Sequence, residues 1–177
     1  MTAKRMAMLI AVTMALAARP AHALPIVVDD DGHPCSNAQF STISAAVAAA
    51  RDGGEIHVCP GTYDEQVVID KNLRIVGLGD PVIRPTSLPE SRPSLISGRP
   101  VTAGILIDGG RTVLKGLVLD LDQNGSVRCT PVMTGIYFRN AGGVVESSQV
   151  RHTATRQENP LAGNLFEYLG NGRVRRF

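Results

Sequence analysis

The sequence predicts an all-β fold, a β-solenoid of about three coils with a capping α-helix at its N-terminal end. The helix is indicated by residues 40–51, where apolar side chains recur at intervals of three and four. Directly after it the apolar period changes to two, in short strands separated by Gly, Asp, Asn or Pro. Two later units that begin with Gly-Ile, at Gly104 and Gly135, repeat a strand–turn–strand pattern. Such repeats indicate stacked units that bury their apolar faces against each other.

The first 23 residues have the pattern of a secretory signal peptide. Lys4 and Arg5 precede an apolar run over residues 6–18, and Ala21-His22-Ala23 is a small-x-small cleavage pattern. The run is shorter than the ~20 residues that cross a bilayer, so an uncleaved anchor is the weaker interpretation. We therefore expect cleavage after Ala23, a secreted or periplasmic protein, and no membrane span in the mature chain.

The mature chain is expected to be close to neutral. Three of the 18 basic residues lie in the signal peptide, which leaves 15 basic residues against 16 acidic ones. A nucleic-acid partner is therefore not expected, because such partners require Lys and Arg clustered on one face.

All three cysteines, Cys35, Cys59 and Cys129, follow the signal peptide. A disulfide is expected in an oxidising compartment, and a bond between Cys35 and Cys59 would fasten the loop before the helix to the first strand after it. Cys129 is then a free thiol, or its partner is missing. Metal ligation by the cysteines is the weaker idea, since no CxxC or paired-His spacing is present.

The elements can be placed along the chain from these patterns. Ser41 is the expected N-cap of the helix, and Gly53-Gly54 is its stop. Strands are expected at residues 24–28, 55–59, 66–70, 73–76, 104–108, 112–121, 135–139 and 143–150. The side chains expected to stack inward in rows are Ile56, Val58, Val67, Ile69, Leu73, Ile75, Ile105, Ile107, Val113, Val118, Ile136 and Val144.

Two segments interrupt this solenoid domain, which is predicted to span residues 24–151, and a tail follows it. Residues 80–103 and 122–133 are expected to loop out of the stack, either as a binding surface or as solvated spacers. The irregular tail 152–177 shows no strand alternation and leaves the end of the stack uncapped. One interpretation is a truncated or frame-disrupted chain, and the other is a short helix or swapped segment that caps the stack. An uncapped end predicts self-association through it.

The helix segment STISAAVAAA is followed by the phrase GEIHVCPGTYDEQVVIDKNLRIVGLG. In this order, residues 38–79 resemble the N-terminal region of pectin lyase-like right-handed parallel β-helix proteins, a superfamily that includes pectinesterases. The later Gly-Ile units resemble further coils of the same helix. The resemblance covers about 110 mature residues and implies a right-handed parallel β-helix. It is specific for the fold but not for an activity, because enzymes, binding proteins and inert members share the phrase. Gly61, Tyr63 and Glu65 match the phrase, and their role looks structural.

Nothing catalytic carries over from that superfamily residue by residue. Its pectinesterases place aspartates in a Gln-Asp-Thr context, which this sequence lacks, and Gln149 is followed by Val150. The carboxylate clusters of its lyases are not recognisable either. We therefore expect an exported protein without a catalytic site that binds polysaccharide or serves as a scaffold. The alternatives are a carbohydrate-active enzyme, of the pectinesterase or polysaccharide lyase type, and an inactive truncated remnant of one.

A metal site is one candidate for ligand binding. Asp120, Asp122 and Asn124 place oxygen atoms at alternate positions before Gly125, like the start of a Ca²⁺ loop. Pro131 stands where the twelfth-position Glu of such a loop is expected, and a polar turn explains the residues equally well. The acidic segment 29–31 is expected to be a solvated turn.

A second candidate is a carbohydrate site. Arg74, Arg84, Arg111 and Arg139 would meet uronate carboxylates if they share a face. Asp108 ends a strand near them, and stacked carboxylates at strand ends are able to do acid–base chemistry on sugars. The alternative for Asp108 is a turn former, the commoner role of Asp at such positions.

Overall fold

The structure, a computed structural model, describes residues 24–121 and 132–151. The predictions for the signal peptide, for Asp122, Asn124 and Cys129, and for the tail 152–177 lie outside the described residues. Among the described residues, no helix is long and apolar enough to cross a membrane.

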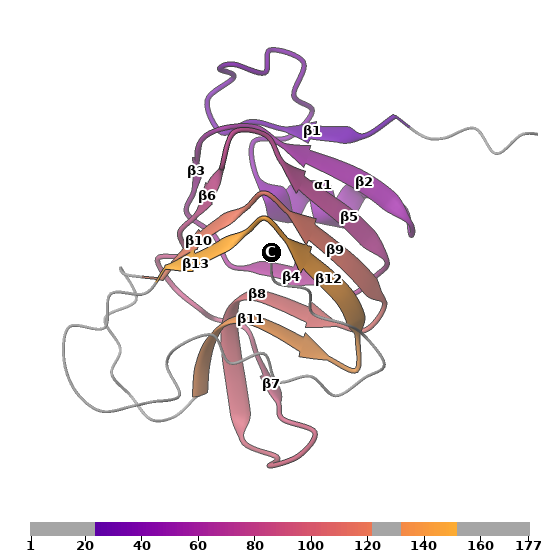
Figure 1. Cartoon of the computed structure of the whole chain (residues 1–177), viewed down its shortest axis with the longest axis vertical. Coiled ribbons are helices and arrows are strands. Elements are labelled where there is room, and N and C mark those ends of the chain that lie inside the picture. Colours follow the sequence, from indigo (N-terminus) through magenta and orange to yellow (C-terminus); the bar gives the residue numbers. More distant parts are fainter. Residues whose placement is uncertain (1–23, 122–131, 152–177) are drawn as a thin grey trace, which may run out of the picture.

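Three parallel sheets form the body of the molecule (Figure 1). Sheet A contains β1 (Ile26–Val28), β2 (Gly54–Val58), β5 (Leu73–Gly77), β9 (Arg111–Lys115) and β12 (Gly142–Glu146). Sheet B contains β3 (Thr62–Tyr63), β6 (Val82–Ile83), β10 (Val118–Asp120) and β13 (Gln149–Arg151). Sheet C contains β4 (Val67–Ile69), β8 (Pro100–Asp108) and β11 (Val132–Arg139), and β7 (Ser91–Pro93) pairs antiparallel with β8.

The chain visits these sheets in a fixed order. From β2 onward it passes through sheets A, B and C, first with β2, β3 and β4, then with β5, β6 and β8, then with β9, β10 and β11. A further pass enters sheets A and B with β12 and β13. Strands of successive passes pair in parallel, so each pass lies on the one before it. The predicted all-β fold with parallel strands is therefore confirmed.

The helix α1 (Ile43–Ala49) is shorter than the expected 40–51, and its N-cap is Thr42 rather than Ser41. Thr42 has an extended backbone, and its side-chain oxygen accepts a hydrogen bond from Ala45 N. Phe40 lies before the helix because it forms a parallel β-bridge with Val28. Ile43, Ala46 and Val47 form the buried face of α1.

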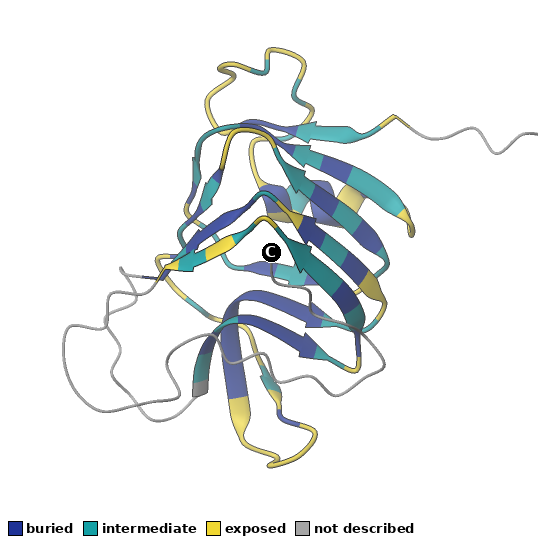
Figure 2. Ribbon diagram, viewed as in Figure 1, coloured by how far each residue is buried: buried dark blue, intermediate teal, exposed yellow. Residues whose placement is uncertain are grey.

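The core runs between the three sheets (Figure 2). Nine of the twelve predicted inward residues lie in it, and Val113, Val118 and Val144 do not. Their neighbours Leu114 and Leu119 are in the core, and Val145 packs against it. These strands carry apolar residues at consecutive positions. Either residue of each pair could therefore point inward, and the alternation of the strand does not decide which one does. The prediction chose the wrong phase for Val113 and Val144, whereas Val118 lies outside the main cluster but is itself buried, at 3% exposed.

Residues 80–103 do not simply loop out of the stack, as predicted from their Pro and Ser content. They contain β6, which pairs in sheet B, and β7, which folds back along the first residues of β8. Val101, Ala103, Leu106 and Tyr137 form a second buried cluster. Leu106 and Tyr137 each stand between two residues of the main core, so this cluster lies on the opposite side of sheet C.

At Gly110 the backbone lies close to the backbone of the previous pass, and a substitution there tests how tightly the passes are stacked. Gly110 has φ +71°, and a Cβ there would lie 2.6 Å from the carbonyl carbon of Lys71 in the previous pass. Gly98 has φ +69° with open space around it. We expect Gly98→Ala to lower the free energy of unfolding by about 1 kcal/mol and Gly110→Ala by about 3 kcal/mol. Urea unfolding measures both, and equal losses would contradict close packing at Gly110.

Candidate functional site

The phrase that carries the family resemblance acts as a set of structural links. The carboxylate of Glu65 accepts hydrogen bonds from Ile43 N at 2.6 Å and from Ser44 N at 2.9 Å, and so satisfies donors in the first turn of α1. The hydroxyl of Tyr63 is buried and donates to the carbonyl of Cys59 at 2.9 Å. These side chains hold the helix and the first strands together, as the resemblance implied.

Asn72 links three segments that are far apart in the sequence. Its backbone N–H and its Nδ2 each lie 2.8 Å from Asp52 Oδ1, and its Oδ1 accepts from Arg111 N at 2.8 Å. These hydrogen bonds hold the pKa of Asp52 below its ordinary value. The candidate sugar ligand Arg111 therefore stands beside this link, with an exposed side chain at the start of β9.

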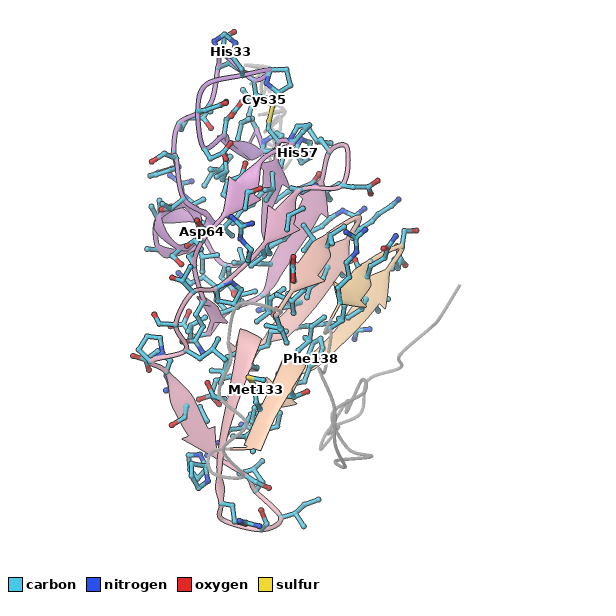
Figure 3. All side chains as sticks on the ribbon, turned by 90° about the vertical axis from the view of Figure 1, so that its left-hand side faces the viewer. His33, Cys35, His57, Asp64, Met133 and Phe138 are labelled. Carbon is cyan, nitrogen blue, oxygen red and sulfur yellow. A yellow bond between two sulfur atoms is a disulfide. The ribbon has the colours of Figure 1, made fainter. Side chains whose placement is uncertain are left out.

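The predicted disulfide between Cys35 and Cys59 is confirmed (Figure 3). It joins the loop that follows β1 to the residue after β2. Closing this loop, with a sequence separation of 24, stabilises the fold by about 3 kcal/mol in the chain-entropy model.

Asp29 organises the loop that this disulfide closes, and the expectation of a solvated turn is wrong for this residue. Asp29 is 3% exposed and accepts hydrogen bonds from the backbone N–H groups of Cys35, Gly32 and Asp31. Burial favours the protonated form, but these donors outweigh it, so the pKa of Asp29 lies below its ordinary value. Asp29, Cys35 and Cys59 lie close enough to share an ion, but the sulfurs are bonded to each other. The group is structural.

Asp108 and Arg139, two of the predicted carbohydrate ligands, are brought together in sheet C. Asp108 Oδ1 accepts from Arg139 Nη1 at 2.8 Å, and Asp108 Oδ2 accepts from Arg92 Nε at 3.0 Å. Arg139 Nε also donates to the carbonyl of Pro93 at 3.0 Å. The pKa of Arg92 is raised by hydrogen bonds from its side chain to Glu90 and Asp108.

This arrangement fastens the β7 segment to sheet C, since both carboxylate oxygens of Asp108 already hold a guanidinium group. The sequence interpretation missed Arg92, because it placed that residue in a projecting loop. Only the return of β7 along β8 reveals the contact. An interaction with sugar would have to displace two charged partners, so this cluster is a weak candidate site.

The remaining predicted residues are spread over other elements. Asp120 ends β10 and pairs in register with Arg151 of β13. Its proposed partners in a Ca²⁺ loop, Asp122 and Asn124, lie outside the described residues, so that site stays a prediction. Self-association through the end of the stack formed by β11, β12 and β13 also stays a prediction.

Arg74 lies on the outer face of the five-stranded sheet A. Two outward rows cross this face in register: Glu55, Arg74, Val113 and Val144, and beside them Val27, His57, Val76, Lys115 and Glu146. Glu55 joins the rows, with Oε1 2.6 Å from His57 Nε2 and Oε2 3.5 Å from Arg74 Nε. The face thus combines charged groups with half-exposed valines.

The outer face of sheet C differs from that of sheet A, because Leu106 and Tyr137 are buried there. The sequence identified Arg74, and the predicted inward direction of Ile56 and Val58 implies that His57 points outward. It missed Val113 and Val144, which it had assigned to the core. Comparison of the chain with protein-family models, with curated proteins and with solved structures gave no match.

The depressed pKa of Asp29 predicts a pH dependence of stability. A carboxylate whose pKa is lower in the folded than in the unfolded chain stabilises the fold above its unfolded pKa of about 3.9. That stabilisation is lost as the pH falls through the folded value. We expect Asp29→Asn to be less stable than the unchanged protein at pH 7, and the difference to shrink below about pH 4. Thermal unfolding of both proteins across pH 2–7 measures this, and a constant difference would contradict the role of the ionised carboxylate.

Proposed function

We propose that this chain is an exported right-handed parallel β-helix protein that binds polysaccharide along the outer face of sheet A and has no catalytic site of its own. The observation that supports binding is the composition of that face. Arg74 and Lys115 offer donors to sugar hydroxyl or carboxylate groups, and Glu146 offers an acceptor. Glu55 holds His57 and Arg74 in place beside them. The half-exposed valines between them suit the apolar C–H surfaces of sugar rings.

The direction of the stack favours a polymer over a small ligand. Neighbouring strands repeat about every 4.8 Å, so a chain molecule laid across β2, β5, β9 and β12 meets a charged side chain at each strand. The contacts are individually weak and exposed, and affinity then grows with the number of strands engaged. A repeating ligand uses all of them at once.

The β-helix assignment is supported by connectivity. The chain passes through sheets A, B and C in the same order on each pass, and all pairings between passes are parallel. Crossover connections between parallel strands of one sheet are right-handed in about 98% of cases. With the resemblance over residues 38–79, these features favour the pectin lyase-like superfamily.

Export is supported by the disulfide. Cys35–Cys59 bonds of this kind persist in secreted and periplasmic proteins and are rare in reducing compartments. This agrees with a signal peptide over residues 1–23 that is cut after Ala23.

A carbohydrate-active enzyme is the second candidate, and the geometry favours it less. Acid–base work on a sugar needs a carboxylate that is accessible to the substrate. Asp108, the predicted carboxylate of this kind, is held by Arg92 and Arg139. On the face of sheet A, Glu55 is held by His57 and Arg74. Glu146 lies on β12, three strand spacings of about 4.8 Å from Glu55, which is farther than the roughly 5–9.5 Å between the two carboxylates of a glycosidase.

Binding to polygalacturonate and to a neutral glucan tests the proposal. We expect Arg74→Gln/Lys115→Gln to weaken binding of polygalacturonate by at least about tenfold, because each lost charge-assisted hydrogen bond is worth roughly 1.5–3 kcal/mol. Isothermal titration calorimetry measures the dissociation constants.

The control is Arg51→Gln/Arg99→Gln, which removes the same charge from exposed positions outside sheet A. It should bind as the unchanged protein does. Equal weakening by both double variants would reduce the effect to net charge, and binding of neither glycan by the unchanged protein would overturn the proposal.

A further inference from the structure

The outer face of sheet B carries a row of alternating charges that the polysaccharide proposal does not use. Tyr63, Ile83 and Leu119 point into the core from β3, β6 and β10, and Val150 of β13 packs against it. The next residue along each strand therefore points outward. These four residues, which we call the charge ladder, are Asp64, Arg84, Asp120 and Arg151.

The register of sheet B places the ladder residues side by side. Arg84 N donates to Tyr63 O at 2.8 Å, and Arg84 Nε lies 3.1 Å from Asp64 Oδ1. Leu119 pairs with Ile83, so Asp120 follows beside Arg84, and Asp120 is the Cα partner of Arg151. The charges along the stack are thus negative, positive, negative and positive, at intervals of about 4.8 Å.

The ladder faces solvent. The side chains of Asp64 and Arg84 are 51% and 38% exposed, Arg151 is exposed, and Asp120 is half-buried. Figure 3 views the molecule from the side on which sheet B lies, with Asp64 labelled. Opposite charges on neighbouring strands stabilise a sheet modestly, which accounts for the pairs within one chain.

We propose that the charge ladder is the contact surface of a two-fold symmetric dimer of this chain. The order of charges is self-complementary: read from the other end, every acid falls opposite a base. A two-fold axis parallel to the strands, midway between β6 and β10, turns one ladder over onto another. Asp64 then meets Arg151 of the second copy, and Arg84 meets Asp120. An isologous interface requires this kind of self-matching surface.

A second copy fits this face better than a uniformly charged polymer does. A second copy sets an opposite charge against each of the four ladder residues, which a polymer of one charge does not do. The strands of sheet B are only two or three residues long, so the contact area is small. Interfaces of that size give weak association, and exposed ion pairs make it sensitive to salt.

Two charge-conserving variants separate the dimer from pairing within one chain. Asp64→Arg/Arg84→Asp keeps an opposite-charge pair between β3 and β6, but its ladder has the same order from both ends. Like charges then face each other at all four positions of the dimer. Arg84→Asp/Asp120→Arg does the reverse. It puts two acids and then two bases side by side within the chain, yet every acid still faces a base across the two-fold axis.

Sedimentation equilibrium of the full chain is the measurement. For the unchanged protein we expect a mass that rises with concentration towards the dimer, and that falls when salt is raised from about 0.1 M to about 1 M, where the Debye length shortens from ~10 Å to ~3 Å. Asp64→Arg/Arg84→Asp should raise the dissociation constant at least about tenfold. Arg84→Asp/Asp120→Arg should dimerise as the unchanged protein does, with a lower melting temperature.

A monomer at every concentration would overturn the proposal. So would association that neither salt nor Asp64→Arg/Arg84→Asp weakens, since that result assigns the contact to the strand edges at the end of the stack. Circular dichroism of each variant confirms the fold before its mass is interpreted. Polysaccharide binding uses the face of sheet A, so its success or failure leaves this result unchanged.

Discussion

Each pass of this chain buries its inward side chains against the passes before and after it, and the rest of the structure depends on that mutual burial. Ile56, Ile75, Leu114 and Val145 form one such row across sheet A, in consecutive register. A single pass has only a few inward positions and could not exclude water from them alone. The parallel backbone pairing between passes fixes the register in which these rows meet.

The same constraint divides the residues into two kinds. Inward positions, and the turns that allow close approach, serve the stack: Asn72 joins neighbouring passes, and Glu65 seats the capping helix on the first pass. Outward positions are free of that requirement and are available for function. Sheet C uses its outward side for a second apolar cluster, which leaves sheets A and B to face other molecules.

The fold was largely predictable from the sequence because its signals are local. The change of period after residue 51, the Gly and Asn turns and the Gly-Ile units placed β1, β2, β4 and β5 within two residues. They merged β9 with β10 and β12 with β13, and they missed the short strands β3, β6 and β7. The phase of β9, β10 and β12 was not predictable, since Val113-Leu114 and Val144-Val145 satisfy either face. In β9 the inward residues are Thr112 and Leu114, so a polar residue is buried where the usual preference of polar residues for water would place it outside.

The candidate sites were less predictable, because they depend on which strands become neighbours. Asp108 and Arg139 were recognised as a potential group, but Arg92 belongs to a segment whose composition indicated a loop. No sequence motif links Asp64, Arg84, Asp120 and Arg151. The alternation of their charges follows only from the register of sheet B. Arg74 was predicted as a candidate ligand, but Val113 and Val144 beside it were predicted to point inward and so were not recognised as part of the surface.

The parallel stacking of successive passes is tested most directly by native-state amide hydrogen exchange. The strands β5 and β9 each have a parallel neighbour on both sides, so their amides should open only with global unfolding. With this stacking, the amides of Ile75 and Leu114 should share the highest free energy of exchange in the protein. Exchange of these amides as rapid as that of the exposed turn at Leu95 and Ile96 would contradict it.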